Sequence, residues 1–143
     1  MSVPRALGLD LGTKTIGMAV SDSLGIAAHG VETFRFESGA YKKAREHVIA
    51  YVQKENIREI ALGLPLHMSG QPSERSESAL RFRDDLLAMM PELTIVMIDE
   101  RMTTMLANKR LLEADLSRAK RHEVIDTMSA VAILETYLAQ RRK

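Results

Sequence analysis

The chain has 143 residues, about the length of one domain, and is long enough to bury a hydrophobic core without cross-links. It contains no cysteine, which excludes disulfides, zinc–thiolate sites and thiol nucleophiles. Hydrophobic residues make up 45% of the chain and charged residues 27%, with a net charge of +1, as is ordinary for a globular protein.

The N-terminal segment 1–5 lacks the basic and then apolar pattern of a secretory signal. No apolar run approaches the roughly 20 residues that a membrane-spanning helix needs. We therefore expect a cytoplasmic protein that does not enter a membrane.

The first third of the chain is predicted to form three antiparallel strands and a helix. Apolar runs over residues 5–11 and 15–21 indicate two strands, and 12–14 has the length and glycine content of a hairpin turn. A third strand over about 26–34 would complete a meander. Residues 39–55 are then apolar at helical spacing, which predicts the first helix.

The middle of the chain alternates strand and helix. Residues 58–64 predict a short buried strand, and the turn-rich segment 66–72 predicts a loop. Ser73 can then cap a helix that runs to about Met90. Residues 94–98 are β-branched or apolar at every position, so we expect a central strand of the sheet that is covered on both faces.

The last third is predicted to be helical. Thr103 or Thr104 can cap a third helix that runs through Leu112, the polar stretch 115–121 interrupts it, and a final helix spans about 122–140. The predicted order is therefore βββαβαβαα. Without a repeat, a low-complexity tract or a long linker, this order favours one α/β domain over the whole chain.

Three carboxylates, those of Asp10, Glu100 and Asp126, belong to otherwise apolar stretches. An ionised carboxylate in a low dielectric must be neutralised, paired or bound to a cation. Three such acids in a chain without cysteine favour a hard cation with oxygen ligands, Mg²⁺ or Mn²⁺. Two such ions about 4 Å apart would clamp a scissile phosphate, so the pattern predicts phosphodiester hydrolysis.

Each acid also has a structural alternative. Asp10 stands between two glycines, which would let an ion approach the backbone, but it could be a turn residue. Asp99 and Glu100 end a strand where α/β sheets place their sites, and alternation sends them to opposite faces. Spacing does not say which one binds the ion, and either could cap the sheet edge or pair with a neighbouring arginine. Asp126 could instead form a core ion pair with His122, one helical turn earlier.

Positive charge gathers in the last third of the chain. Residues 101–143 carry 9 Lys and Arg against 5 Asp and Glu, whereas residues 1–100 carry 11 against 14. A basic segment beside an acidic metal site would suit a polyanion, although a solvated helix surface explains it equally well. With 4% aromatic residues and no tryptophan, readout of backbone and shape is expected rather than base stacking. Candidate contacts to the nucleic-acid backbone are Lys14, Arg101, Lys120 and Arg121.

Five blocks of sequence resemble the YqgF family, which is described as Holliday junction resolvases and as nucleases that mature the precursor of 16S ribosomal RNA. They occur in the family's order and cover nearly the whole chain. The blocks are Gly8-Leu9-Asp10-Leu11-Gly12, Gly17-Met18-Ala19-Val20-Ser21-Asp22, Gly63-Leu64-Pro65 with Gly70, Asp99-Glu100-Arg101-Met102-Thr103-Thr104, and Ile125-Asp126 with Ala130 and Ile133-Leu134.

The resemblance implies a single ribonuclease H-like domain over residues 1–143. Its mixed five-stranded sheet would consist of the antiparallel meander and two parallel strands, flanked by helices. The resemblance also implies that Glu100 rather than Asp99 joins Asp10 and Asp126 as a catalytic, metal-binding acid. Its acidic block also contains Arg101 and adds two further candidate substrate contacts, Thr103 and Thr104. The family tends to have a lysine-rich loop before the last acid, and here His122 and Glu123 are added to a basic segment without an assigned role.

Two other functions fit parts of the sequence. A phosphate-binding domain of the actin and sugar kinase type would need a second lobe, for which no second Asp-x-Gly motif is present. A non-catalytic nucleic-acid-binding factor involved in transcription would keep the fold without turnover. Expected partners are structured RNA or branched DNA, with ribosomal precursor particles among them. The sequence does not choose between RNA and DNA, or between a monomer and a homodimer.

Overall fold

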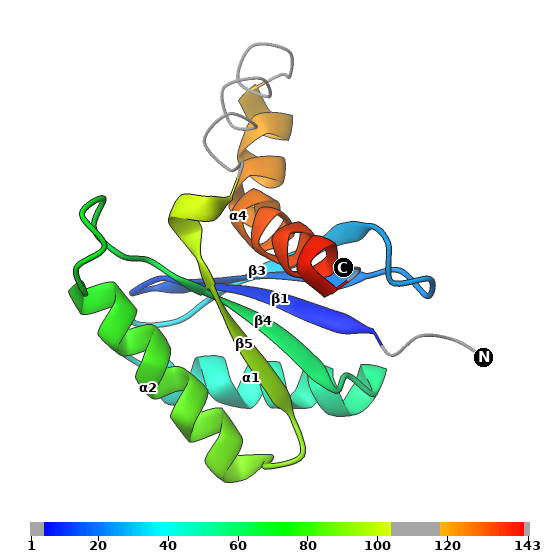
Figure 1. Cartoon of the computed structure of the whole chain (residues 1–143), viewed down its shortest axis with the longest axis horizontal. Helices are drawn as coiled ribbons and strands as arrows, with labels where there is room; N and C mark the ends of the chain where they lie inside the picture. Colours follow the sequence, from blue (N-terminus) through cyan, green and yellow to red (C-terminus); the bar gives the residue numbers. More distant parts are fainter. Residues whose placement is uncertain (1–4, 104–117, 142–143) are drawn as a thin grey trace.

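The computed structural model describes residues 5–103 and 118–141, with side chains for 5–103 and 127–141. Strands and helices alternate largely as the sequence pattern predicts (Figure 1). The elements are β1 (Ala6–Leu11), β2 (Thr15–Ser21), β3 (Ala28–Arg35), α1 (Tyr41–Glu55), β4 (Glu59–Leu64), α2 (Glu74–Met89), β5 (Thr94–Asp99), the short 3₁₀ helix η1 (Glu100–Met102) and α4 (Arg118–Arg141).

The strands form one five-stranded mixed sheet in the order β3-β2-β1-β4-β5. Strands β1 to β3 pair antiparallel, whereas β4 pairs parallel with both β1 and β5. In the first hairpin the Gly12 N–H donates to the Thr15 carbonyl at 2.7 Å. The predicted meander with two added parallel strands is therefore confirmed.

Strand β5 lies at an edge of the described sheet, so its predicted central place is wrong. Its apolar run has another cause, since helices cover both faces of this edge strand. Ile95 and Met97 pack against the core on the side of α1 and α2. Val96 and Ile98 pack against the core under α4. Coverage on both faces, rather than a central position, explains the apolar run from 95 to 98, whereas Thr94 is exposed.

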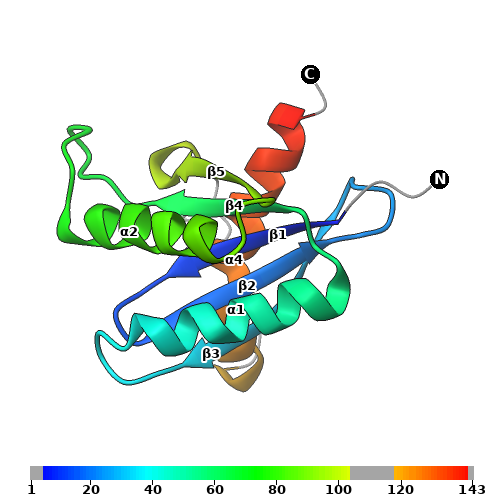
Figure 2. The same cartoon turned by 90° about the horizontal axis from the view of Figure 1, so that it is seen from below.

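Helices α1 and α2 cover one face of the sheet and α4 the other (Figures 1 and 2). Helix α4 lies directly on small residues of the strands. A Cβ atom added to Gly8 would lie 2.7 Å from both the Ala130 carbonyl oxygen and the Leu134 Cβ, and one added to Gly63 would lie 2.6 Å from the Ile133 Cδ1. Glycines in β1 and β4 thus let α4 approach the backbone closely.

Replacing Gly8 by Ala is expected to lower the free energy of unfolding by about 1–3 kcal/mol, because the new methyl group meets atoms at or near the α4 backbone and the helix must move. Urea denaturation of the purified variant would measure the change. A loss below about 0.5 kcal/mol, typical of surface substitutions, would contradict this account of α4 packing.

The ends of several elements differ from the prediction for local reasons. Strand β3 begins at Ala28 rather than 26, because the Ile26 N–H donates to Asp22 Oδ1 at 2.9 Å within the preceding turn. Helix α1 begins two residues late, after Gly39 with φ of +79°. The predicted cap of α2 is confirmed, since the side chain of Ser73 accepts a hydrogen bond from the Ser76 N–H.

Helix α4 begins at Arg118, four residues before the predicted start. The basic stretch there consists of good helix formers, which extend the helix rather than interrupt it. The predicted helix from Thr103 or Thr104 through Leu112 falls largely outside the described residues. The described residues just before it, Glu100–Met102, form the 3₁₀ helix η1. No described helix combines the length and the apolarity that crossing a bilayer would require.

Candidate active site

The carboxyl ends of β1, β4 and β5 meet at one edge of the sheet, because these strands are parallel. Leu9 pairs with Leu62, so the next residues along, Asp10 and Gly63, are neighbours at this edge. On the far side of β4, Gly63 pairs with Ile98, two residues before Glu100. Asp10 and Glu100 therefore flank Gly63, as expected for parallel strands.

Both acids belong to the sheet face that α4 covers. Alternation puts Asp10 on the same side of β1 as Ala6, which is part of the core under α4. The Glu100 side chain lies over Gly63, since a Cβ atom added there would be 3.2 Å from its carboxyl carbon and 3.3 Å from its Cγ. The absence of a side chain at Gly63 thus provides the space that the Glu100 carboxylate occupies.

One oxygen of each acid, Asp10 Oδ1 and Glu100 Oε2, is buried from solvent. Burying carboxylate oxygens is costly unless a cation or a donor compensates them. An oxygen-only donor set of this kind fits Mg²⁺ or Mn²⁺. The described residues contain no group of three or more His, Asp or Glu side chains placed to hold a metal. They supply two acids of the predicted set.

The third predicted acid, Asp126, belongs to α4, but its side chain lies outside the described ones. The helical repeat puts position 126 on the same face as Ala130 and Ile133, which lie against Gly8 and Gly63 of the sheet. Its place in the site stays a prediction, and so does the alternative ion pair with His122. Thr104, Lys120 and Arg121 also lie outside the described side chains.

Asp99 pairs with Arg101 instead of joining Asp10 and Glu100. The Arg101 Nε lies 3.1 Å from both Asp99 carboxylate oxygens, and its Nη2 lies 2.7 Å from Oδ2. The Arg101 backbone N–H donates to Oδ1 at 2.9 Å. Hydrogen bonds from the Arg101 side chain hold the pKa of Asp99 below its ordinary value, and Asp99 in turn raises the pKa of Arg101.

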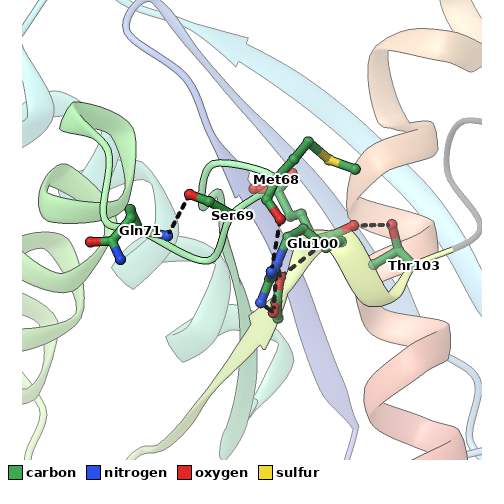
Figure 3. A network of polar contacts seen from close by, with 7 residues as sticks. Met68, Ser69, Gln71, Glu100 and Thr103 are labelled. Carbon is green, nitrogen blue, oxygen red and sulfur yellow. Dashed lines mark hydrogen bonds and ion pairs between the residues drawn. The ribbon is translucent and has the colours of Figure 1, made fainter.

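Arg101 also ties the loop after β4 to the site. Figure 3 labels Met68, Ser69 and Gln71 of this loop, together with Glu100 and Thr103. Its Nη1 donates to the Met68 carbonyl oxygen at 3.3 Å. Gly70, with φ of +90°, lies against the same guanidinium, and a Cβ atom there would be 3.3 Å from Nη1. The Thr103 hydroxyl donates to the Glu100 carbonyl at 2.9 Å and helps to close η1. The hydrogen bonds from Arg101 to Asp99 and to Met68 thus fix the orientation of its guanidinium.

Replacing Asp99 by Asn is expected to raise the KM of the predicted phosphodiester hydrolysis about tenfold with a smaller change in kcat, because Arg101 loses its charged partner but Asp10 and Glu100 stay. Steady-state kinetics would separate the two constants. The lowered pKa of Asp99 means that the pair, with its contribution to stability, is lost only as pH falls below the ordinary carboxyl range. A break near neutrality in the pH profile of the wild-type KM that is absent from the Asp99→Asn variant would contradict this assignment.

Arg75 is the site residue that the sequence reasoning missed. It lies in the first turn of α2, and its Nη2 donates to the Leu11 carbonyl at 3.0 Å. The same nitrogen lies 3.6 Å from Asp10 Oδ1. In the sequence Arg75 looks like any solvated helix residue, and the contact spans 64 positions, so no local pattern indicates it. Predicted Lys14 is exposed in the adjacent β1–β2 turn.

Comparison with known proteins identifies a family and relatives that this chain resembles over nearly its whole length. Residues 4–140 match the model of the RuvX family, described as Holliday junction resolvase. A protein of Staphylococcus carnosus named "Putative pre-16S rRNA nuclease" is 41% identical over 138 residues, which is 96% of this chain and 97% of the relative. A protein of Staphylococcus saprophyticus with the same name is 40% identical over 134 residues, 94% of each chain.

Two solved resolvases share the fold. The structure of Thermus thermophilus RuvC in complex with a Holliday junction substrate has a TM-score of 0.63 at 13% identity, covering 99% of this chain and 98% of that one. The Fowlpox virus resolvase, solved with Holliday junction DNA, has a TM-score of 0.59 at 12% identity, covering 97% and 99%. These likenesses confirm the ribonuclease H-like arrangement of the sheet and helices.

Proposed function

Because the chain belongs to the RuvX (YqgF) family of Holliday junction resolvases, we propose that it is a metal-dependent nuclease that hydrolyses nucleic-acid phosphodiester bonds. The proposed substrate is the precursor of 16S ribosomal RNA, which the protein would mature at its 5′ end, working in the cytoplasm. The names of the Staphylococcus relatives support this choice. The observation that carries the chemistry is the pair of acids with buried oxygens, Asp10 and Glu100, on either side of Gly63.

Asp10 and Glu100 would hold the cation, Mg²⁺ or Mn²⁺, and we propose Asp126 as the third acid of the site. When bound, a pair of such cations supplies activation of water and stabilisation of the leaving oxygen. The protein's own part is to fix the acids. Glu100 is the first residue of η1, and its side chain packs over Gly63. Asp10 belongs to β1, which is paired with a strand on each side.

Basic and hydroxyl groups would hold the substrate backbone. Arg101 is oriented by Asp99, and its Nη1 and Nη2 each have a second N–H group for a phosphate oxygen. Lys14 projects from the neighbouring turn. Thr103 and Thr104, and Lys120 and Arg121 of α4, complete the proposed set of contacts.

Cleavage of four-way DNA junctions is the second candidate function, favoured by the description of the family. Purified protein would be incubated with precursor 16S RNA and with a four-way junction, each with Mg²⁺, with Mn²⁺ and with chelator. Metal-dependent trimming of the RNA supports the first proposal, and paired nicks in the junction support the second. Binding without cleavage of either substrate would overturn both and leave the non-catalytic binding factor.

The oligomeric state separates the same alternatives. A junction resolvase must cut two strands and is expected to act as a homodimer, whereas a monomer suffices to trim RNA or ribosomal precursor particles. Light scattering of the protein alone and with each nucleic acid would measure the oligomeric state.

The Asp126→Asn variant tests the third acid of the proposed site. Full activity in that variant would remove Asp126 from the site.

A further inference from the structure

Arg75 is held at the carboxyl end of β1 by a helix from the opposite face of the sheet. It is the second residue of α2, whose start is fixed by the Ser73 cap, and the Ser73 hydroxyl also donates to the Pro65 carbonyl at 2.5 Å. From there the guanidinium reaches the Leu11 carbonyl at 3.0 Å. Its Nη2 is then 3.6 Å from the Asp10 carboxylate, so a positive charge lies beside a proposed metal-binding acid.

The contacts of Arg75 differ from those of a structural arginine. Arg141, at the end of α4, contacts both Glu59 carboxylate oxygens, at 3.2 and 3.0 Å, and its side chain is 23% exposed. Arg75 donates to one carbonyl, and its side chain is 49% exposed. Among the described residues, that single bond uses one of the five guanidinium N–H groups. A half-exposed arginine with so few contacts contributes little to stability.

We infer that Arg75 is a phosphate-binding residue, which contacts a phosphate oxygen of the nucleic-acid backbone where that backbone passes the carboxyl end of β1. A guanidinium with outward N–H groups matches phosphate geometry. Lys14 follows β1 and Arg101 follows β5 at the same edge, and Arg75 contacts the end of β1. The backbone would then run along this edge, from the turn after β1 to η1. The inference rests on the proposed function only in taking nucleic acid as the ligand.

The experiment measures binding without cleavage. A fluorescent RNA hairpin with a single-stranded 5′ arm would be titrated with protein in EDTA at several salt concentrations. Arg75→Met is expected to weaken binding about tenfold and to reduce the slope of log K against log salt by about 0.7–0.9, the loss of one phosphate contact. Arg75→Lys should restore the slope but only part of the affinity, because an ammonium group cannot form the bidentate contact.

Arg83→Met is the matched control. Arg83 lies on the same helix, pairs with Asp84 next to it at 3.0 Å and is 32% exposed, so its loss should leave both RNA affinity and slope unchanged. A second readout separates ligand binding from support of Asp10. The Arg75→Met change removes the guanidinium charge that lies 3.6 Å from Asp10, so Mn²⁺ affinity, measured calorimetrically, should be unchanged or higher.

The outcomes separate this inference from the proposed function. Unchanged slope in Arg75→Met, or weaker Mn²⁺ binding with a lower melting temperature, would overturn the inference and make Arg75 a structural residue. If Arg75 governs RNA binding but the wild type cleaves neither substrate, the inference holds and the nuclease proposal fails. If the wild type binds neither the RNA hairpin nor a four-way DNA junction, in EDTA or with Ca²⁺, a nucleic-acid ligand is excluded and both fail.

Discussion

Replacing Asp10 by Asn is expected to lower kcat by about 10³-fold or more, because a catalytic metal contributes several kcal/mol and would lose a charged ligand. The same change should leave the free energy of unfolding unchanged or raise it. Asp10 Oδ1 is buried, and the neutral amide avoids the cost of an ionised group there. Single-turnover cleavage assays and urea denaturation would measure the two effects separately.

Asp84→Asn is a suitable control, since the Asp84 side chain is 63% exposed on α2 and pairs with Arg83 next to it. It should change neither activity nor stability by much. Glu100→Gln should repeat the Asp10→Asn result, because its oxygen is buried in the same way. Cleavage that survives both substitutions would remove these acids from the site, while loss of activity together with unfolding would show that they are structural.

The strand ends of the site could be predicted from the sequence because local rules govern them. Parallel strands share a carboxyl edge, so acids that end two of them must be close. Alternation also separates Asp99 from Glu100, and the structure adds the reason, since Arg101 takes Asp99 as its partner. Spacing alone could not say which acid would pair. The resemblance chose Glu100, and the Arg101 contact is consistent with that choice.

Other features depend on contacts that no local pattern contains. The edge position of β5 was mispredicted because a strand covered on both faces by helices has the same apolar run as a central strand. Arg75 was missed because its contact joins α2 to a strand 64 positions earlier. Helix α4 begins earlier than predicted because its charged first turn consists of good helix formers, which continue the helix rather than break it.

Replacing Gly63 by Ala is expected to reduce kcat about 10²-fold while lowering the free energy of unfolding by only about 1–2 kcal/mol. The new methyl group would lie 2.6 Å from the Ile133 Cδ1, a side-chain end that can turn away. It would also lie 3.2 Å from the Glu100 carboxyl carbon, so the carboxylate must shift by a few tenths of an ångström. The contact with Ile133 therefore mainly determines the loss of stability, and the contact with Glu100 mainly determines the loss of catalysis.

A second substitution separates these two contacts. Ile133→Val removes the Cδ1 atom, so in the Gly63→Ala background it should cost less stability than the about 0.5–1.5 kcal/mol that it costs alone. The double variant should nevertheless stay poorly active, because the methyl group still displaces Glu100. If activity returned along with stability, the loss would come from α4 packing rather than from the acid. Persistent inactivity in a stable double variant would mean that Gly63 is required to place the Glu100 carboxylate.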